Sequence, residues 1–256
     1  MKDLIRAEKL SVGYDRRPLL RNVDLSVPAG RLTVLIGANG SGKTTLVKTL
    51  SGLLPPLSGE IFYGERKWNG RDLHDLARRR SFVSSGEMPF GPFSVWDWVA
   101  TGRLPYSGWN GRLTPVDIEI VEHAIARVGM AGFSGRALNT LSQGELQRVR
   151  IAKALAQDTP LMLFDEPFSH LDFPSRVQLF GLVKKLCRED GKGIVVITHE
   201  LDLALQKAGR IWMIDREGKF YEGENSVLRS GEWLDRLFDT DVVRYDRKTG
   251  RFEYID

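Results

Sequence analysis

The sequence predicts an α/β fold built around a parallel sheet. Strands that are buried on both faces are indicated by three nearly continuous apolar runs, Leu32–Ile36, Leu161–Phe164 and Ile194–Thr198. Segments with helical periodicity lie between such runs, and alternating strands and helices favour parallel pairing. A glycine-rich loop also joins the first run to the helix that follows it, which is where ligands bind in many folds of this class.

The first elements along the chain differ from these buried strands. Apolar and polar residues alternate in Leu4–Val12, Val23–Val27 and Glu60–Tyr63, and Gly, Pro or Asn residues bound each segment. This pattern predicts an antiparallel β flap beside the parallel core. Two more short apolar runs, Phe82–Ser84 and Ile211–Ile214, complete the predicted strands.

Helical periodicity predicts four helices, Thr44–Ser51, Val116–Val128, Gln143–Ala156 and Ser175–Arg188. The middle of the chain, about residues 86–158, is poor in β-branched runs and rich in this periodicity. We therefore expect a helical subdomain inserted into the α/β core. A C-terminal extension, residues 223–256, is expected to pack on that core, with a turn at Asp246–Gly250 between two short strands.

Composition describes an ordinary globular chain. The 256 residues carry 37 Lys and Arg against 33 Asp and Glu, a net charge of +4. This weak positive charge is a poor signal for nucleic acid. No apolar run approaches the roughly 18 residues of a membrane-spanning helix. The N-terminus has no signal-like stretch, so we expect a cytoplasmic protein. A single cysteine, Cys187, excludes a disulfide framework and is expected to be a packed thiol.

A phosphate-binding loop is the most specific motif. It matches the pattern G-x-x-x-x-G-K-[ST] with Gly37, Ala38, Asn39, Gly40, Ser41, Gly42, Lys43 and Thr44, and Thr45 adjoins it. Glycines let the backbone curl so that N–H groups point at phosphates. Lys43 can reach the β- and γ-phosphates, and the Thr44 hydroxyl can ligate Mg²⁺. A chance glycine-rich turn is the alternative, which the preceding strand and following helix argue against. The motif predicts a nucleoside triphosphate site.

Two acids and a histidine follow other buried strands. Asp165 and Glu166 end the run Leu161–Phe164, and a carboxylate at this end of a parallel strand lies beside the loop. Asp165 can hold Mg²⁺ through water, and Glu166 can orient or deprotonate the attacking water. His199 follows the next strand and can bond to the γ-phosphate. The alternatives are that the two acids simply mark an ordinary strand end and that the histidine is a helix N-cap or a packed residue.

The remaining motifs resemble those of ATP-binding-cassette (ABC) ATPases. The family's signature is similar to Leu141–Glu145 followed by Gln147 and Arg148, about 20 residues before Asp165. Its D-loop resembles Ser169–Asp172, although His170 stands where a small residue is commoner. His199 resembles its switch histidine. Tyr14, after Gly13, resembles its adenine-stacking aromatic, with an ordinary surface aromatic as the alternative.

This resemblance implies a fold and a mode of action. The P-loop NTPase fold of ABC ATPases would cover residues 1–222, and ATP and Mg²⁺ would be bound. Two copies would dimerise head to tail with ATP between them. Lys43 and Thr44 of one copy would then face Ser142, Gly144 and Glu145 of the other. Ser142 begins the predicted helix Gln143–Ala156, so its hydroxyl and the helix dipole suit the γ-phosphate.

One stretch resembles a particular branch of the family. Asp97–Tyr106 is similar to a segment of importers of iron–siderophore complexes, haem and vitamin B12, which often carry G-R-x-P-Y/H. Those systems combine two copies of such a chain with two transmembrane permease subunits and an extracytoplasmic substrate-binding protein. The chain would then lie on the inner face of the membrane through the permease. The alternative is that Trp96, Trp98, Leu104 and Tyr106 simply form subdomain core.

One position departs from the family pattern. Where the family has a glutamine that contacts Mg²⁺ and the attacking water, this chain has Ser85, and Glu87 is the nearest acid. We expect Ser85 to slow hydrolysis without abolishing ATP binding, unless the alignment is shifted in register. A binding module with a degraded site is the corresponding alternative, against which the intact Lys43, Asp165, Glu166 and His199 argue.

A soluble ABC ATPase that acts on DNA or ribosomes is a further alternative. Members that resemble DNA-repair machines carry long coiled-coil insertions, and ribosome-associated members carry two cassettes with a charged linker. The sequence has neither feature. We therefore expect an importer ATPase without a nucleic-acid partner.

Overall fold

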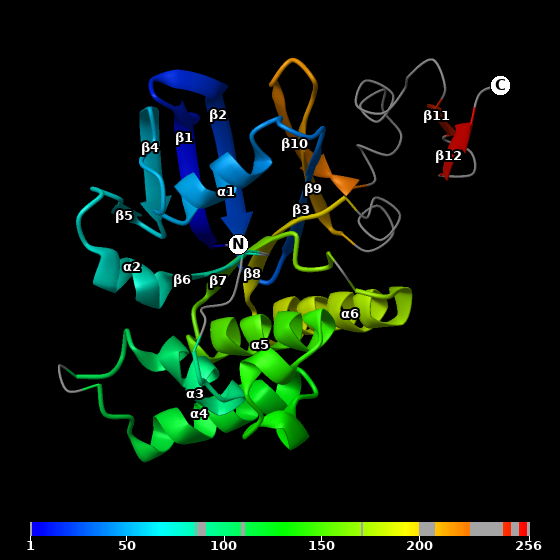
Figure 1. Ribbon diagram of the computed structural model, residues 1–256. Coiled ribbons are helices and arrows are strands. Elements are labelled where there is room, and N and C mark those ends of the chain that lie inside the picture. The colour runs from blue at the N-terminus through cyan, green and yellow to red at the C-terminus, as the bar shows by residue number, and fades with distance from the viewer. Residues whose placement is uncertain are drawn as a thin grey trace.

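The structure is a computed structural model, drawn in Figure 1, and it describes most of the chain. The described residues are 2–84, 86, 91–108, 111–169, 171–199, 208–225, 243–246 and 251–254. They form a six-stranded sheet, a four-stranded sheet, a two-stranded hairpin and a group of helices. None of the helices in this part of the chain combines the length and the apolar character needed to cross a bilayer.

The six-stranded sheet is the parallel core. Its strands are β3 (Leu32–Gly37), β6 (Arg80–Val83), β7 (Leu161–Asp165), β8 (Gly193–Ile197), β9 (Arg210–Ile214) and β10 (Phe220–Glu224). Their order is β10-β9-β3-β8-β7-β6, and all neighbours are parallel except the pair β9 and β10. Ile197 of β8 is in register with Leu35 on one side and with Asp165 on the other. The carboxyl ends of β3, β8 and β7 therefore lie at one edge of the sheet.

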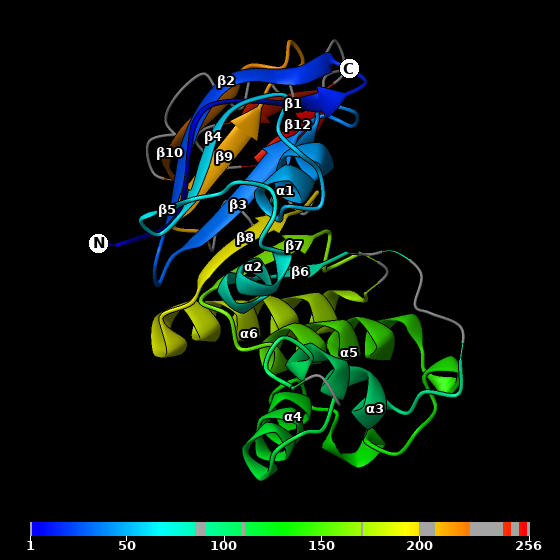
Figure 2. The ribbon, with the colours of Figure 1, turned by 90° about the vertical axis from the view of Figure 1, so that its left-hand side faces the viewer.

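The antiparallel sheet packs beside this core, as Figure 2 shows. It consists of β1 (Asp3–Tyr14), β2 (Arg17–Pro28), β4 (Ser58–Tyr63) and β5 (Arg66–Lys67), in the order β2-β1-β4-β5. The turn between β1 and β2 needs Gly13, because a Cβ there would overlap the Arg17 carbonyl oxygen. Asp15 and Arg16 in this turn have φ values of 47° and 61°, the left-handed pair that matches the twist of a tight hairpin.

Six α-helices complete the described fold: α1 (Lys43–Leu50), α2 (Leu73–Arg79), α3 (Val95–Ala100), α4 (Pro115–Arg127), α5 (Gln143–Ala156) and α6 (Phe173–Asp190). Short 3₁₀ turns at Thr101–Arg103, Ala131–Phe133 and Leu138–Thr140 connect α3, α4 and α5. In both ribbon views these three helices gather at one end of the molecule, on the far side of α6 from the antiparallel sheet. The division into domains stays a prediction.

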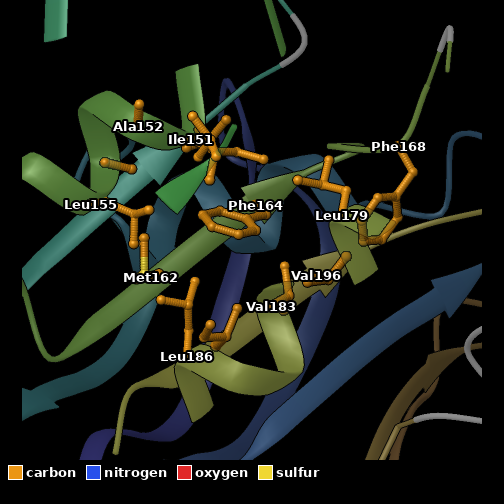
Figure 3. Packing of buried hydrophobic residues seen from close by; sticks show 14 of the residues in the cluster. Ile151, Ala152, Leu155, Met162, Phe164, Phe168, Leu179, Val183, Leu186 and Val196 are labelled. Carbon is orange, nitrogen blue, oxygen red and sulfur yellow. The ribbon is translucent and has the colours of Figure 1, made fainter. Parts of the chain in front are cut away.

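Alternate residues of the core strands pack on opposite faces, because side chains of a strand have a period of two. Met162 and Phe164 of β7 pack with residues of α5 and α6 on one face, as seen in Figure 3. Leu161 and Leu163 pack on the other face, with residues of α1 and the antiparallel sheet. The sheet is thus covered on both faces, which is why its strands are nearly continuous apolar runs.

Most strands and the long helices agree with the sequence predictions to within about two residues, but β2 (Arg17–Pro28) begins six residues before the predicted strand Val23–Val27. The elements that periodicity missed are short or half-exposed. Helices α2 and α3 span seven and six residues, which is too little for a helical period to stand out. Strand β5 has only two residues, and the edge strand β10 carries no apolar run, because no residue in it is fully buried.

Two predictions concern Cys187 and the C-terminal extension. Cys187 is buried on α6, where burial raises the pKa of its thiol to about 12, so the prediction of a packed thiol is confirmed. Strands β11 (Val243–Asp246) and β12 (Arg251–Tyr254) pair antiparallel, as expected of two strands joined by a turn. The connecting residues 247–250 lie outside the described part, and packing of the extension on the core stays a prediction.

The G-R-x-P-Y stretch holds the helices together. Arg103 Nε donates to Asp117 Oδ1 at 2.8 Å, and a second guanidinium nitrogen donates to the Ala156 carbonyl at 2.9 Å, which ties the turn after α3 to α4 and to the end of α5. A Cβ at Gly102 would lie 2.5 Å from the Lys153 carbonyl oxygen, so only glycine permits this approach. The Tyr106 ring lies 4.0 Å from the Arg103 guanidinium. This part of the stretch therefore has a packing role.

The neighbouring apolar residues divide between core and surface. Trp96 and Trp98 are partly buried against the helical core, as the packing alternative predicts. Leu104 is 56% exposed, so including it in the subdomain core is wrong. Leu104 follows the 3₁₀ turn Thr101–Arg103, in which Gly102 and Arg103 are the buried residues.

Arg103→Met is expected to lower the free energy of unfolding by about 3 kcal/mol, because it leaves a buried Asp117 without its cation. Side-chain exposure is 7% for both partners, so solvent cannot replace the lost contact. Urea denaturation followed by circular dichroism measures the effect. Removing both charges with Arg103→Met and Asp117→Leu is expected to recover part of the loss. The exposed Arg21→Met is the matched control, and an equal midpoint for both single variants would contradict a structural role.

Candidate functional site

The phosphate loop lies between β3 and α1, at the carboxyl edge of the parallel sheet. Gly37 ends β3, and Lys43, Thr44 and Thr45 begin α1. Gly40 and Gly42 have φ values of 77° and 98°, a region that residues with a side chain rarely adopt. The loop is therefore held in a conformation that only its glycines permit, with the start of α1 facing into it.

Lys43 is buried inside this loop. Its ammonium donates to the Gly37 carbonyl at 2.9 Å and to the Ala38 carbonyl at 2.8 Å. Burial lowers the pKa of Lys43, while the charges of Glu166 and Asp165 oppose that shift. Only 6% of the residue is exposed. The positive charge is thus fixed within the loop, where a phosphate would approach it.

Ser41 supplies a test of whether a phosphate fits. Its hydroxyl is buried and has no hydrogen-bond partner among the described residues. Buried polar groups are almost always paired, so an orphan donor in a curled glycine loop suits an acceptor that comes with a ligand. The exposed Asn39 and Gly40 form the outer rim of the loop. Together with Lys43, this donor set fits the phosphates of a nucleotide.

Thr44 and Asp165 meet although 121 positions separate them in the sequence. The Thr44 hydroxyl donates to Asp165 Oδ1 at 3.2 Å. Burial raises the pKa of Asp165, and so does the charge of Glu166, whereas the Thr44 hydrogen bond and nearby lysines oppose the shift. A hydroxyl and a carboxylate at this distance are the oxygen ligands that Mg²⁺ prefers. The pair therefore fits a divalent cation beside the phosphate loop.

Glu166 and His199 face each other across the ends of β7 and β8. His199 Nε2 lies 3.0 Å from Glu166 Oε1. Both residues are partly exposed, with 47% of the histidine side chain and 36% of the glutamate side chain accessible. A carboxylate and an imidazole within hydrogen-bond distance can share the handling of a proton. The structure thus brings both residues to the same edge as the loop.

The backbone of Glu166 is strained. Its φ is 52°, in the left-handed region that a glutamate rarely occupies. Its N–H donates to the Ile197 carbonyl at 3.1 Å, and its own carbonyl accepts from the Ser169 N–H at 3.3 Å and from the Ser169 hydroxyl at 2.9 Å. Such strain persists only where the surroundings determine it, and it is common at functional sites. This contact of Ser169 could not be predicted from sequence, because a serine three residues after an acid is not a specific pattern.

The signature residues lie on a different helix. Ser142 caps α5, its hydroxyl accepts from the Glu145 N–H at 3.3 Å, and Glu145 Oε2 accepts from the Ser142 N–H at 2.7 Å. These bonds hold the pKa of Glu145 below its usual range. Gly144 lies close to the Leu171 side chain, because a Cβ added at Gly144 would be 3.2 Å from Leu171 Cδ2. The sheet separates α5 from α1 in both views, so the described chain does not bring these residues to its own phosphate loop (Figures 1 and 2).

Tyr14 stands at the edge of the phosphate loop. Its hydroxyl accepts a bond of 3.4 Å from the Thr45 hydroxyl at the start of α1. With 48% of the residue exposed, much of the ring is open to solvent, which suits stacking on a planar base. Ser85, Glu87 and His170 lie outside the described residues.

A wide groove elsewhere on the molecule contains none of these residues. It measures about 1020 Å³ and lies over the antiparallel sheet, near Lys9, Asp24 and Glu222.

Comparison with known proteins identifies a family. A model described as ABC transporter matches residues 20–169. The chain is 33% identical to the achromobactin transport ATP-binding protein of Dickeya dadantii, covering 93% of this chain and 88% of the relative. It is 31% identical to the iron(3+)-hydroxamate import ATP-binding protein of Bacillus subtilis, with coverage of 93% and 88%. It is 32% identical to the ferric enterobactin transport ATP-binding protein of Escherichia coli K12, with coverage of 91% and 86%.

Solved structures agree on the fold. A Clostridium perfringens protein, CbiO1 of the ABC transporter complex CbiONQ, superposes with a TM-score of 0.80 at 24% identity, covering 92% of this chain and 94% of that one. A bacterial ABC transporter cassette solved as a dimer superposes with a TM-score of 0.75 at 26% identity, covering 86% and 98%. The predicted ABC ATPase fold is therefore confirmed.

Proposed function

The chain belongs to the ABC transporter family, and from this premise we propose that it energises a membrane importer of ferric siderophores. Binding and hydrolysis of ATP coupled to transport come with the family. The relatives named above act in achromobactin, ferric hydroxamate and ferric enterobactin transport, and they match nearly the whole chain. The same names favour siderophores over the haem and vitamin B12 cargoes of the wider branch.

The observation that supports this proposal is that three sets of contacts lie at one edge of the sheet. Lys43 is bonded within its loop, Thr44 is bonded to Asp165, and His199 lies against Glu166. ATP would enter with its phosphates among the N–H groups of the loop, and Lys43 would exchange its loop carbonyls for phosphate oxygens. The half-exposed Tyr14 would stack on the adenine.

Glu166 would act on the attacking water. Its Oε1 would orient the water and accept its proton, and His199 would bond to the γ-phosphate while holding the carboxylate in place. The strained backbone at Glu166, held by Ser169 and Ile197, would keep the carboxylate at the loop. Thr44 and Asp165 would hold Mg²⁺, which when bound neutralises charge on the β- and γ-phosphates.

The site is incomplete within one chain, which supports a second copy as partner. Ser142, Gly144 and Glu145 lie at the start of α5, across the sheet from the loop of their own chain. In a head-to-tail dimer they would cover the γ-phosphate of the other copy with a helix N-terminus. Two permease subunits and an extracytoplasmic binding protein would complete the importer, with the chain on the cytoplasmic face of the membrane.

Co-expression with the permease subunits of a ferric-siderophore importer tests the function. The complex is expected to purify as a unit, to hydrolyse ATP with Mg²⁺, and to take up a ferric siderophore into vesicles when its binding protein is supplied. Hydrolysis without association with any permease would favour a soluble ABC ATPase. Uptake of haem or vitamin B12 in place of a ferric siderophore would show that the proposed cargo is wrong.

Ser85→Gln is expected to raise kcat for ATP hydrolysis about tenfold, because it restores the amide side chain that the family has at this position, lowering the barrier by about 1.4 kcal/mol. The KM for ATP is expected to change little, since Lys43 and the loop bind the phosphates. Steady-state phosphate release measures both constants. Ser84→Gln, one position earlier, is the matched control. An unchanged rate in Ser85→Gln would mean that another group already fills this role.

A further inference from the structure

Arg17 at the start of β2 is a cation without a partner in the described part of the chain. The residue is exposed, and its guanidinium makes no hydrogen bond or ion pair with another described residue. In the antiparallel pair of β1 and β2, Arg17 directly opposes Tyr14. Residues that oppose each other in this way project from the same face of a sheet. The Arg17 side chain therefore leaves the hairpin on the side of the Tyr14 ring.

This face of the hairpin is directed at the phosphate loop. The Tyr14 hydroxyl accepts a bond from the Thr45 hydroxyl at the start of α1. Leu19 follows Arg17 by two residues and so projects from the same face. A Cβ added at Gly42 would lie only 3.2 Å from the Leu19 Cβ, which places this leucine against the loop. Contacts with the loop and with α1 are thus made on both sides of Arg17.

The backbone around Arg17 is fixed before any ligand binds. Asp15 and Arg16 form the turn with φ values of 47° and 61°, and a Cβ at Gly13 would lie 2.0 Å from the Arg17 carbonyl oxygen. This close approach of the two strands holds the register that sets Arg17 opposite Tyr14. Only the Arg17 side chain has to be ordered when it binds a ligand, which keeps the entropic cost of that contact low.

The chemistry of a guanidinium selects the ligand atoms. It only donates hydrogen bonds, in a planar fork that matches phosphate oxygens. In the proposed binding mode Lys43 contacts the β- and γ-phosphates and Tyr14 stacks on the adenine, so the α-phosphate lies between these two residues. An extended arginine side chain is at least as long as that of a tyrosine, and the Tyr14 hydroxyl already reaches α1. The Arg17 guanidinium can therefore reach the phosphate that adjoins the nucleoside.

We propose that Arg17 binds the α-phosphate of the nucleotide, so that the opposing residues Tyr14 and Arg17 hold adjoining parts of one ligand. This inference rests on the proposed function and adds a residue to the same site. An α-phosphate is common to nucleoside diphosphates and triphosphates of every base. Arg17 therefore contributes equally to the affinity for ATP and for ADP, whereas Lys43 favours ATP through the γ-phosphate.

Calorimetric titration of the full chain with nucleotides and Mg²⁺ tests this assignment. Arg17→Ala is expected to raise the Kd about tenfold, the effect of losing a charge-assisted hydrogen bond to phosphate. The same factor is expected for ADP and for the non-hydrolysable β,γ-imido analogues of ATP and GTP. Arg17→Lys keeps a charge but not the planar fork, so it is expected to lose about threefold. The unfolding midpoints of both variants are expected to match the parent, because the side chain is exposed.

Two neighbouring arginines supply the controls. Arg21 is exposed on the same strand, but it follows Leu20, which also faces Gly42, so Arg21 projects from the opposite face. Arg16 lies in the turn itself, where glycine accepts its left-handed φ. Arg21→Ala and Arg16→Gly are each expected to change the Kd less than about twofold, as exposed charges away from the ligand do.

Three results would overturn the assignment. One is an unchanged Kd in Arg17→Ala, and another is an equal loss in either control variant, which general positive charge would explain. The third is a loss that differs between ATP and ADP analogues or between adenine and guanine nucleotides, which would place Arg17 at the γ-phosphate or at the base. A parent chain that binds no nucleotide would overturn the proposed function as well, whereas parent binding that Arg17→Ala leaves unchanged would overturn this inference alone.

Discussion

Glu166→Gln is expected to lower kcat for ATP hydrolysis by about 10²–10⁴-fold, the range that a general base contributes. The amide keeps the size of the carboxylate and a hydrogen-bonding oxygen, but it cannot accept a proton from the attacking water. His199 would still find an oxygen within reach of its 3.0 Å contact. ATP is therefore expected to bind with the parent affinity and to remain uncleaved.

A trapped nucleotide has a consequence for assembly. If ATP lies between Lys43 of one copy and Ser142 of the other, a variant that binds without hydrolysing holds the two copies together. Glu166→Gln with ATP and Mg²⁺ is expected to elute as a dimer in size-exclusion chromatography with light scattering, whereas the parent returns to monomers as ATP is consumed. The double variant with Glu166→Gln and Lys43→Ala is expected to stay monomeric with ATP. Glu122→Gln on α4 serves as the control.

Two results would contradict this reading of Glu166. Hydrolysis at the parent rate would mean that another group takes the proton. If the variant hydrolyses ATP slowly but stays monomeric with ATP, Glu166 would remain the proposed base, and the proposed head-to-tail dimer would be wrong. Glu166→Gly separates backbone from side-chain effects, because glycine accepts the φ of 52° without strain. It is expected to be as slow as Glu166→Gln and at least as stable as the parent.

Much of the fold follows from local pattern. The buried strands β3, β7 and β8 are predictable because both of their faces pack, which makes their sequences nearly continuous apolar runs. The helix α5 is predicted to the residue, since Ser142 and Glu145 form a capping box at its start. Short elements such as α2 are not predicted from the sequence, because seven residues hardly define a helical period.

The site is predictable in its parts rather than in its contacts. The loop and the acids after β7 are placed by one rule, that carboxyl ends of parallel strands share an edge. No sequence rule gives the bond of Thr44 to Asp165, because it depends on how α1 sits on the sheet. The left-handed backbone of Glu166 and the hydrogen bond from Arg150 to the Gly86 carbonyl likewise arise from long-range packing.

Lys43→Ala is expected to weaken ATP binding by about 100-fold, because it removes charged hydrogen bonds to phosphate that are worth about 1.5–3 kcal/mol each. Turnover at saturating ATP is expected to fall by a further factor of about 100, since the same charge stabilises the transferring phosphoryl group. Equilibrium binding of a fluorescent ATP analogue measures the first effect. Phosphate release measures the second.

The folded state of Lys43→Ala has its own expected behaviour. The ammonium donates to the Gly37 and Ala38 carbonyls, so its removal takes one donor from each of them, although the Ala38 carbonyl still accepts from the Ser41 N–H at 3.3 Å. Removing a buried charge also relieves the desolvation that lowers the pKa of Lys43. These effects oppose each other, so the unfolding midpoint is expected to stay close to that of the parent.

The matched control for this charge lies one turn further along the same helix. Lys48→Ala removes a half-buried lysine near the end of α1, and it is expected to leave ATP affinity within about threefold of the parent, because Lys43 keeps its bonds inside the loop. Equal losses in both variants would mean that general positive charge, and not the ammonium held inside the loop, binds the phosphates. Intact binding in Lys43→Ala would place the nucleotide elsewhere and remove the basis for Glu166 as its base.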